Sequence, residues 1–288
     1  MTPRIINFHI TDKCNYHCQY CFAKFHQDDL PVEDAKRVID NIADFFTKKK
    51  VCAPRINIAG GEPLLYPHLD EIIDHIHKKE IDVSLITNAS ALTVDRIASW
   101  KGKVASIGIS VDAVSRQTNL CIGRCQYGEP LDLAHLFEVA DAIHQNGIAS
   151  KINTVVSKLN LAEDMKPVYM RLQPDKIKFL AMHVIESANG KASSLAPTTE
   201  EYYAFIQKNK PDGKVLVIIE EPGSMENSYF MIDPHGDVYM NDHGEEKRYG
   251  CCLDQPLTAI YTTIPLYMEK YMQRYSQNVK PDGFHPYM

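Results

Sequence analysis

Long hydrophobic runs are missing from this 288-residue chain, since no segment contains about 18 uninterrupted apolar residues. The first ten residues also lack the charged leader and apolar stretch of a secretory signal. Blocks of like charge are absent as well, and the net charge is only −6, which argues against a general nucleic-acid surface. We therefore expect a cytoplasmic protein that has neither a membrane nor a nucleic acid as partner.

Two further absences narrow the class of protein. No G-x4-G-K-[ST] sequence occurs, which disfavours a P-loop ATPase. The 16 prolines and 14 glycines are spread along the chain without a linker, a repeat or a low-complexity block. A hydrophobic content of 44% then predicts one compact domain with a single substantial core.

Apolar periodicity predicts helices that alternate with short strands. Helices are expected at Asp34–Phe46, Leu69–Ile76, Val94–Trp100, Leu133–Gln145 and Glu163–Leu172, and strands at Ile5–Ile10, Arg55–Ile58, Val83–Ile86, Ala105–Val111, Ser150–Val156 and Ile177–Met182. This alternation is typical of parallel β/α units, so we predict an α/β protein with a partial (β/α)6 TIM-like barrel over residues 1–190. Strand-like Val215–Ile219 and Tyr229–Ile232 suggest that residues 191–288 form an extension that closes the barrel and the substrate site.

A cysteine triplet follows the first predicted strand. Cys14, Cys18 and Cys21 have C-x3-C-x2-C spacing on a predicted loop, where functional residues of such barrels collect. Three thiolates can hold three irons of a 4Fe-4S cluster and leave the fourth iron open to another ligand. The competing interpretation is a zinc site, with His9, His17 or His26 as the fourth ligand that structural zinc prefers.

A glycine motif, Gly60-Gly61-Glu62-Pro63, follows the second predicted strand. Adjacent glycines let backbone groups approach a ligand closely, and a glutamate carboxylate can accept from an ammonium group. Taken alone, the motif could equally be an ordinary turn between a strand and a helix. Its position after the cysteine triplet favours a binding role.

Together these motifs resemble the radical S-adenosylmethionine (SAM) superfamily, whose members cleave SAM at a 4Fe-4S cluster. The resemblance implies a barrel of the radical SAM type and a glycine motif that binds the methionine amino group. It also implies further cofactor contacts. The implied SAM-binding residues are Tyr20, Gly60, Gly61, Glu62, Asn88, Ser110, Asp112 and Arg124.

Within that superfamily the chain is similar to the viperin family, as a short, soluble, microbial type of member. The stretches that carry the similarity are Asn7-Phe8-His9, Ile122-Gly123-Arg124 with Gln126, Lys151-Ile152-Asn153 with Val155, Asn160 with Glu163-Asp164-Met165, and Asn227-Ser228-Tyr229. Three positions depart from the usual pattern, namely Arg55, Ala59 and Cys125. The segment after about residue 255 shows no similarity.

Basic side chains at alternate positions suggest an anion site. Lys151 and Asn153 share one face of a predicted strand, and Lys176 and Lys178 share one face near the next strand. Lysines on the inside of a barrel require an anion, although they could instead face outward or reach solvent at strand ends. The family resemblance favours the first view and implies a triphosphate site. The implied substrate residues are Asn7, Arg55, Lys151, Asn153, Lys176, Lys178 and Lys247.

The resemblance implies a specific reaction. A nucleoside triphosphate, CTP before UTP and GTP, would lose its ribose 4′-hydrogen and then its 3′-hydroxyl, giving a 3′-deoxy-3′,4′-didehydro chain terminator. A flavodoxin or ferredoxin would supply electrons. Two alternatives stay open at this point: a radical SAM enzyme acting on a peptide or small carboxylate, and a non-enzymatic iron-sulfur sensor. An auxiliary cluster on Cys121 and Cys125 or on Cys251 and Cys252 is disfavoured by their spacing.

Overall fold

Parallel strands and covering helices alternate through the first part of the chain. The computed structural model describes residues 2–22, 29–213, 215–221 and 223–276. Its first six long strands are β1 (Ile5–Thr11), β2 (Arg55–Gly60), β3 (Asp82–Thr87), β4 (Val104–Ser110), β7 (Ala149–Val156) and β8 (Lys176–Ala181). The helices that separate them are α1 (Val32–Lys48), α2 (Leu69–His77), α3 (Val94–Ser99), α4 (Arg116–Ile122), α5 (Leu133–Gln145) and α6 (Lys166–Leu172), with short strands β5 (Cys125–Gln126) and β6 (Glu129–Pro130) forming a small separate sheet.

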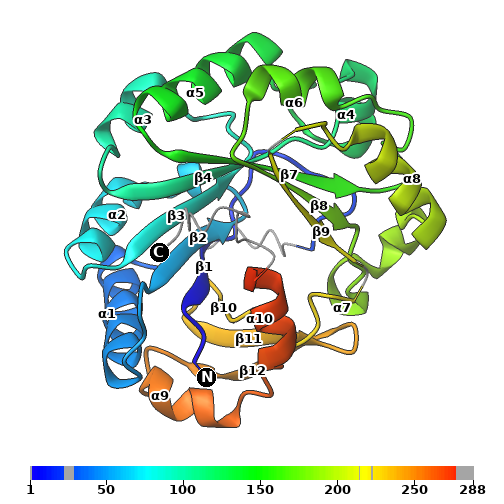
Figure 1. The fold of residues 1–288 in the computed structure, drawn as a ribbon. Helices are drawn as coiled ribbons and strands as arrows, with labels where there is room; N and C mark the ends of the chain where they lie inside the picture. The colour runs from blue at the N-terminus through cyan, green and yellow to red at the C-terminus, as the bar shows by residue number, and fades with distance from the viewer. Residues whose placement is uncertain (1, 23–28, 214, 222, 277–288) are drawn as a thin grey trace.

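The long strands form one sheet in the order β12-β11-β10-β1-β2-β3-β4-β7-β8-β9. Every pairing from β10 round to β9 is parallel, and the two ends of the order do not pair within the described residues. The strands curve around a centre with α1, α2, α3, α5, α6 and α8 outside them (Figure 1). This arrangement confirms the predicted partial TIM-like barrel.

Residues after about 190 extend both ends of the same sheet. The elements here are α7 (Glu186–Asn189), α8 (Thr199–Asn209), β9 (Leu216–Glu220), β10 (Met231–Ile232), β11 (Asp237–Asp242), β12 (Glu245–Cys251), α9 (Leu257–Ile260) and α10 (Met268–Ser276). β9 adds a seventh parallel strand beside β8, whereas β10 pairs with β1 at the other end and leads into antiparallel β11 and β12. A division at residue 190 stays a prediction.

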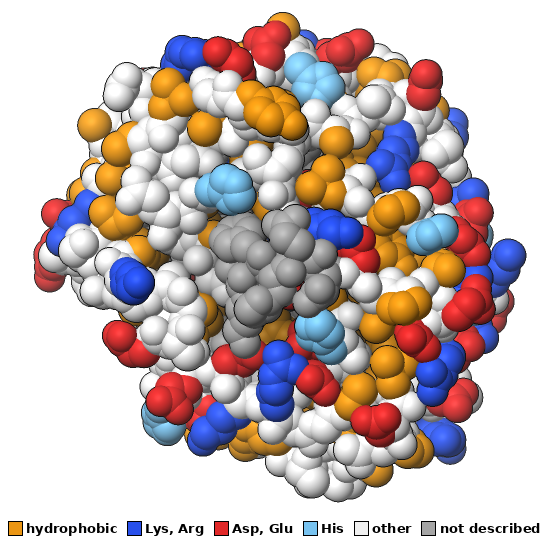
Figure 2. Space-filling model, turned by 180° about the vertical axis from the view of Figure 1, so that it is seen from behind, with side chains coloured by type: hydrophobic (Ala, Val, Ile, Leu, Met, Phe, Trp, Pro, Cys, Tyr) orange, Lys and Arg blue, Asp and Glu red, His pale blue; other side chains and the backbone are white. Residues whose placement is uncertain are grey.

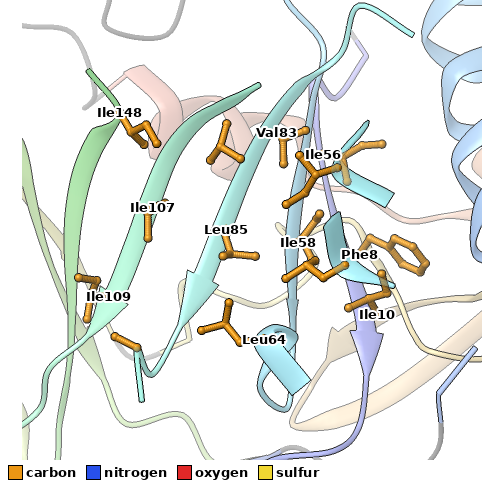
Figure 3. Packing of buried hydrophobic residues seen from close by; sticks show 14 of the residues in the cluster. Phe8, Ile10, Ile56, Ile58, Leu64, Val83, Leu85, Ile107, Ile109 and Ile148 are labelled. Atoms are coloured by element: carbon orange, nitrogen blue, oxygen red, sulfur yellow. The ribbon is translucent and has the colours of Figure 1, made fainter. Parts of the chain in front are cut away.

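The two faces of the sheet differ in chemistry because side chains alternate along each strand. The outer face carries the apolar core, in which Phe8, Ile58, Leu85 and Ile107 are almost fully buried beneath the helices (Figure 3). Helix α1 meets this layer with six buried apolar residues at helical spacing. The apolar periodicity of the sequence therefore determines which face of the sheet packs against the helices and which face lines the barrel interior.

The inner face carries a ladder of polar side chains across β1, β2 and β3. Asn57 donates to the Oδ1 atom of Asn7 at 2.7 Å, and Ser84 donates to the Oδ1 atom of Asn57 at 2.9 Å. Asn7 in turn donates to the carbonyl of Phe230 at 3.2 Å. Polar groups inside a sheet persist when they are hydrogen bonded, so this ladder gives the barrel a polar interior at little cost.

Membrane insertion was not expected from the sequence. None of the helices in the described part of the chain has the length and apolar character that crossing a bilayer requires.

Candidate active site

The cysteine triplet lies on the loop that leaves β1 at the carboxyl end of the barrel. The loop is held by backbone bonds from His17 to Gly123 at 3.1 Å and from Gln19 to Ile122 at 2.9 Å. Cys14, Cys18 and Cys21 are all free thiols, and all are partly exposed. Burial raises the pKa of Cys14 to about 11 and that of Cys18 to about 12, and neighbouring thiols add to both shifts. These thiols therefore hold their protons in the metal-free chain, and binding iron would require each to release its proton to solvent and ligate as a thiolate.

The spacing of the thiols suits a cluster better than a single zinc ion. Sulfurs around one tetrahedral zinc, with Zn–S near 2.3 Å, lie about 3.8 Å apart. Among the described residues, the one group of three ligand atoms that all lie within 4.8 Å of one another is Glu226, Asp242 and His243, so the three cysteine sulfurs are not all that close. His9, a candidate fourth ligand, is instead bonded to Tyr239, and His26 lies outside the described residues. Three separated thiolates, each for its own iron, match a 4Fe-4S cluster.

The glycine motif packs directly on the cysteine loop. A Cβ atom on Gly60 would lie 2.3 Å from the carbonyl oxygen of Thr11, and one on Gly61 would lie 2.3 Å from that of Lys13. Gly61 and Glu62 donate backbone bonds to the same two carbonyls at 2.7 Å. Glycine is therefore required here because two backbone segments meet, in addition to any role in holding a ligand.

Glu62 links this loop to the end of β3. Its buried carboxylate accepts from Thr87 at 2.6 Å and from the backbone N–H groups of Asn88 at 2.6 Å and Leu64 at 3.1 Å. Burial raises its pKa, although these bonds oppose the shift. Asn88 itself donates to Asn15 at 2.9 Å, on the cysteine loop. The residues expected around the methionine group thus form one connected network.

A second network joins β4 to the cysteine loop. Asp112 accepts from Tyr20 at 2.6 Å and pairs with Arg124 at 2.8 Å. Arg124 also donates to the carbonyl of Ser110 at 2.6 Å and lies 4.0 Å from the sulfur of Cys18. The structure therefore brings every predicted SAM-binding residue to the carboxyl end of the barrel. Of these residues only Gly60 and Ser110 line the central cavity, and the others lie behind or beside it.

A cavity of about 380 Å³ occupies the barrel centre, next to the cysteine loop. Six of the seven predicted substrate residues line it: Asn7, Arg55, Lys151, Asn153, Lys176 and Lys178. Registers explain this, because Lys151 lies opposite Lys176 and Asn153 lies opposite Lys178 on β7 and β8. We call Arg55, Lys151, Lys176 and Lys178 the cationic wall.

Charges in the cationic wall repel one another. Burial, together with the repulsion of the neighbouring cations, lowers the pKa of Lys151 to about 7 and that of Lys176 to about 6. Lys178 pairs with Glu220 at 2.5 Å, and Arg55 pairs with Asp82 at 2.7 Å. The Lys151 ammonium makes no hydrogen bond or ion pair with any residue that the structure describes. A bound anion would favour the charged form of Lys151 and Lys176 and form charge-assisted hydrogen bonds with them.

Sequence reasoning missed Glu220, which lies at the end of β9 and lines the cavity. Its carboxylate accepts from Tyr229 at 2.8 Å besides pairing with Lys178. Its only local signal was its place directly after a strand-like run. Its partners come from distant parts of the chain, so spacing could not reveal them.

Lys247 is the predicted substrate residue that the structure does not bring to this cavity. It pairs with Asp242 at 2.5 Å, and its side chain is 53% exposed. The next residue, Arg248, lines the cavity instead, paired with Asp233 at 2.7 Å. Neighbouring residues of a strand point to opposite faces of the sheet. Lys247 is therefore one position away from the residue that faces the cavity, and its own side chain points outward.

Comparisons with known proteins agree with this geometry. The sequence model of the Radical SAM superfamily matches residues 8–169, more than half of the chain. A protein of a Thermoplasmatales archaeon (strain ISO4-H5), named S-adenosylmethionine-dependent nucleotide dehydratase, is 31% identical over 85% of this chain and 86% of its own. The chain belongs to this family of radical SAM enzymes. A relative of the same name from Selenomonas ruminantium is 28% identical over 94% of this chain and 98% of its own.

A solved structure supports the fold of this radical SAM enzyme. The crystal structure of Streptococcus suis SuiB bound to S-adenosylmethionine superposes with a TM-score of 0.67 at 15% identity, over 93% of this chain and 68% of that one. Family membership excludes the non-enzymatic sensor and establishes SAM and a 4Fe-4S cluster as the cofactors. The three separated thiols and the adjoining glycine loop fit that pair of groups.

Replacing Cys14, Cys18 or Cys21 singly with alanine should abolish cluster binding, because each thiolate holds its own iron. Iron content and visible absorbance after anaerobic reconstitution measure this. Cys52→Ala is the matched control, since Cys52 is an exposed thiol away from the loop. A variant of the triplet that retains a full cluster would contradict the ligand assignment.

The low pKa of Lys151 predicts a pH-dependent stability. Below pH about 7, Lys151 is charged in both the folded and the unfolded chain, and burying its charge destabilises the fold. Between pH 7 and 10.5, Lys151 is charged only in the unfolded chain. The free energy of unfolding should therefore rise with pH across this window in the wild type, and Lys151→Met should reduce that rise to the part that Lys176 contributes. Denaturant titrations of the metal-free chain at several pH values test it, and parallel pH curves would show that Lys151 keeps its usual pKa.

Proposed function

We propose that this enzyme converts a nucleoside triphosphate, CTP before UTP and GTP, into its 3′-deoxy-3′,4′-didehydro analogue. The observation that carries the proposal is the cationic wall, because it lines the same cavity that Cys21 of the cysteine triplet lines. The relatives' shared name, nucleotide dehydratase, supports the class of substrate and the loss of water.

A triphosphate is the ligand class that suits the wall best. Its several negative charges would offset the repulsion among Lys151, Lys176 and Arg55, which together lower the lysine pKa values. Asn7 and Asn153 add neutral polar groups beside these cations. A peptide or a small carboxylate would bring fewer negative charges to these four basic side chains, so the alternative radical SAM reaction is disfavoured.

The wall would also decide which atom reacts. When bound, the cluster and SAM supply a 5′-deoxyadenosyl radical, which removes a hydrogen atom from the sugar. Cations near the start of β2, β7 and β8 would hold the phosphates there, which would turn the ribose and its C4′ towards the cofactor end. The 3′-hydroxyl then leaves, and one electron and one proton complete the conversion to the alkene and water.

Other aspects of the proposal concern partners and setting. We assign electron supply to a flavodoxin or ferredoxin, and place the enzyme in the cytoplasm, where its eight free thiols stay reduced. Charges of both signs are interspersed over the face in Figure 2, as suits a protein that does not bind nucleic acid or a membrane. The product lacks a 3′-hydroxyl and would terminate polymerase chains, an antiviral activity.

Isotope transfer tests the reaction itself. The reconstituted enzyme is given SAM, dithionite and CTP, UTP, GTP or ATP that carries deuterium at C4′ or at C3′. Deuterium from C4′ should appear in 5′-deoxyadenosine, and the nucleotide should lose water, both by mass spectrometry. Label from C3′ should not appear in 5′-deoxyadenosine, and its transfer would overturn the proposed regiochemistry.

Truncation of the cationic wall tests the triphosphate site. Lys151→Ala should weaken CTP binding by about 1.5–3 kcal/mol, because a charge-assisted bond to phosphate is lost. Binding of SAM should barely change in the same calorimetric titrations. Lys158→Ala, an exposed lysine beyond the end of β7, is the matched control. If cytidine and CTP bind the wild type equally well, no triphosphate site exists.

A further inference from the structure

His9 and Tyr239 form a pair on the cavity wall that the reaction described so far does not use. Both residues line the cavity, and the Tyr239 hydroxyl lies 2.7 Å from the Nδ1 atom of His9. The rings meet edge to face, with centroids 5.8 Å apart. β1 and β11 carry the two side chains, so the pair joins the first strand to the C-terminal extension.

The hydrogen bond fixes which ring nitrogen carries the proton. Burial, Glu246 and other nearby carboxylates hold the pKa of Tyr239 well above 10, so its hydroxyl keeps its proton. Burial lowers the pKa of His9 to about 4 although Glu246 opposes this, so the imidazole is neutral. Among described residues the hydroxyl has no other partner, so we assign it as donor to Nδ1. The proton of His9 then sits on Nε2, which makes no hydrogen bond with any described residue.

The position of His9 matches that of the sugar. Along the inner face of β1, Asn7 comes first and belongs to the polar ladder beside Arg55, whereas the loop with Cys14 follows the strand. His9 lies between these two levels, opposite Ala59 in the register with β2. If the phosphates lie on the cationic wall and the ribose faces the cofactor, the sugar lies at the same height along β1 as His9.

The reaction needs a proton here. Loss of the 3′-hydroxyl breaks a C–O bond whose electron pair stays on oxygen, and that oxygen becomes water only by gaining a proton. We infer that His9 donates this proton from Nε2 to the departing 3′-hydroxyl, and that Tyr239 orients the imidazole and returns a proton to Nδ1. The inference rests on the proposed function.

The proton transfer balances without any additional reagent. As the C3′–O bond breaks, the Nε2 proton moves to oxygen and the Tyr239 proton moves to Nδ1, which leaves a neutral imidazole and a tyrosinate. Hydroxide is the conjugate base of water, whose pKa is about 16, so even a weakly acidic tyrosine is a sufficient source. Solvent restores the tyrosine proton after product leaves. The electron that completes the reaction comes from the same donor that reduces the cluster.

The test separates hydrogen abstraction from dehydration. His9→Gln and Tyr239→Phe are reconstituted and given CTP deuterated at C4′, and both 5′-deoxyadenosine and dehydrated nucleotide are quantified. Each variant should still transfer deuterium, but the ratio of dehydrated nucleotide to 5′-deoxyadenosine should fall at least about tenfold. Tyr66→Phe is the control, because it removes a buried hydroxyl bonded at 2.8 Å to the Leu30 carbonyl, away from the cavity.

A purely structural effect would lower both products together and leave their ratio at the wild-type value, and that result would overturn the inference. Tyr239→Phe keeps the ring and its packing, so it decides the question even if His9→Gln does not fold. The proposed function fails in a different way, since the wild type itself would then release no dehydrated nucleotide from any of the four triphosphates.

Discussion

Repulsion between buried cations is the constraint on which the rest of the structure depends. Lys151 and Lys176 stand opposite each other on β7 and β8 and line the central cavity, and burial leaves both reluctant to hold a proton. Glu220 pairs with Lys178, whereas the Lys151 ammonium has no ion-pair partner among the described residues. An interior of this kind lowers stability and is kept where an anion is to be bound. The apolar layer under the helices supplies the stability that the cavity does not.

Much of this arrangement was predictable from the sequence because it follows from short-range patterns. Apolar residues at two-residue and three-to-four-residue spacing located the strands and the helices. The same alternation placed Lys151, Asn153 and Lys178 on the inner face, and parallel pairing then brought them together. The cysteine loop was evident from spacing alone, since Cys14, Cys18 and Cys21 lie within eight residues. Local physics determines each of these features.

Features that depend on distant partners were missed. Glu220 and Tyr229 gain their roles from Lys178, and Tyr239 gains its role from His9, which is some 230 positions away in the chain. No local pattern encodes such a contact. The structure places Lys247 away from the cavity because a strand in the extension has no recognisable register in the sequence, and a shift of one residue exchanges the inner and outer faces. The run Tyr229–Ile232 was predicted and contains β10, but β11, β12 and the pairing of β10 with β1 were not predicted.

The place of β1 in the sheet has a consequence for how the chain is made. One edge of β1 pairs with β2, which is synthesised soon afterwards, but the other pairs with β10, where Asn7 meets Met231. At roughly 5–20 residues per second, a ribosome needs about 10–45 s to supply that second partner. During this interval the first strand has an open edge, the kind of surface on which strands from other chains add. Completion of the barrel is therefore a late event in biosynthesis, and exposure to aggregation is greatest before it.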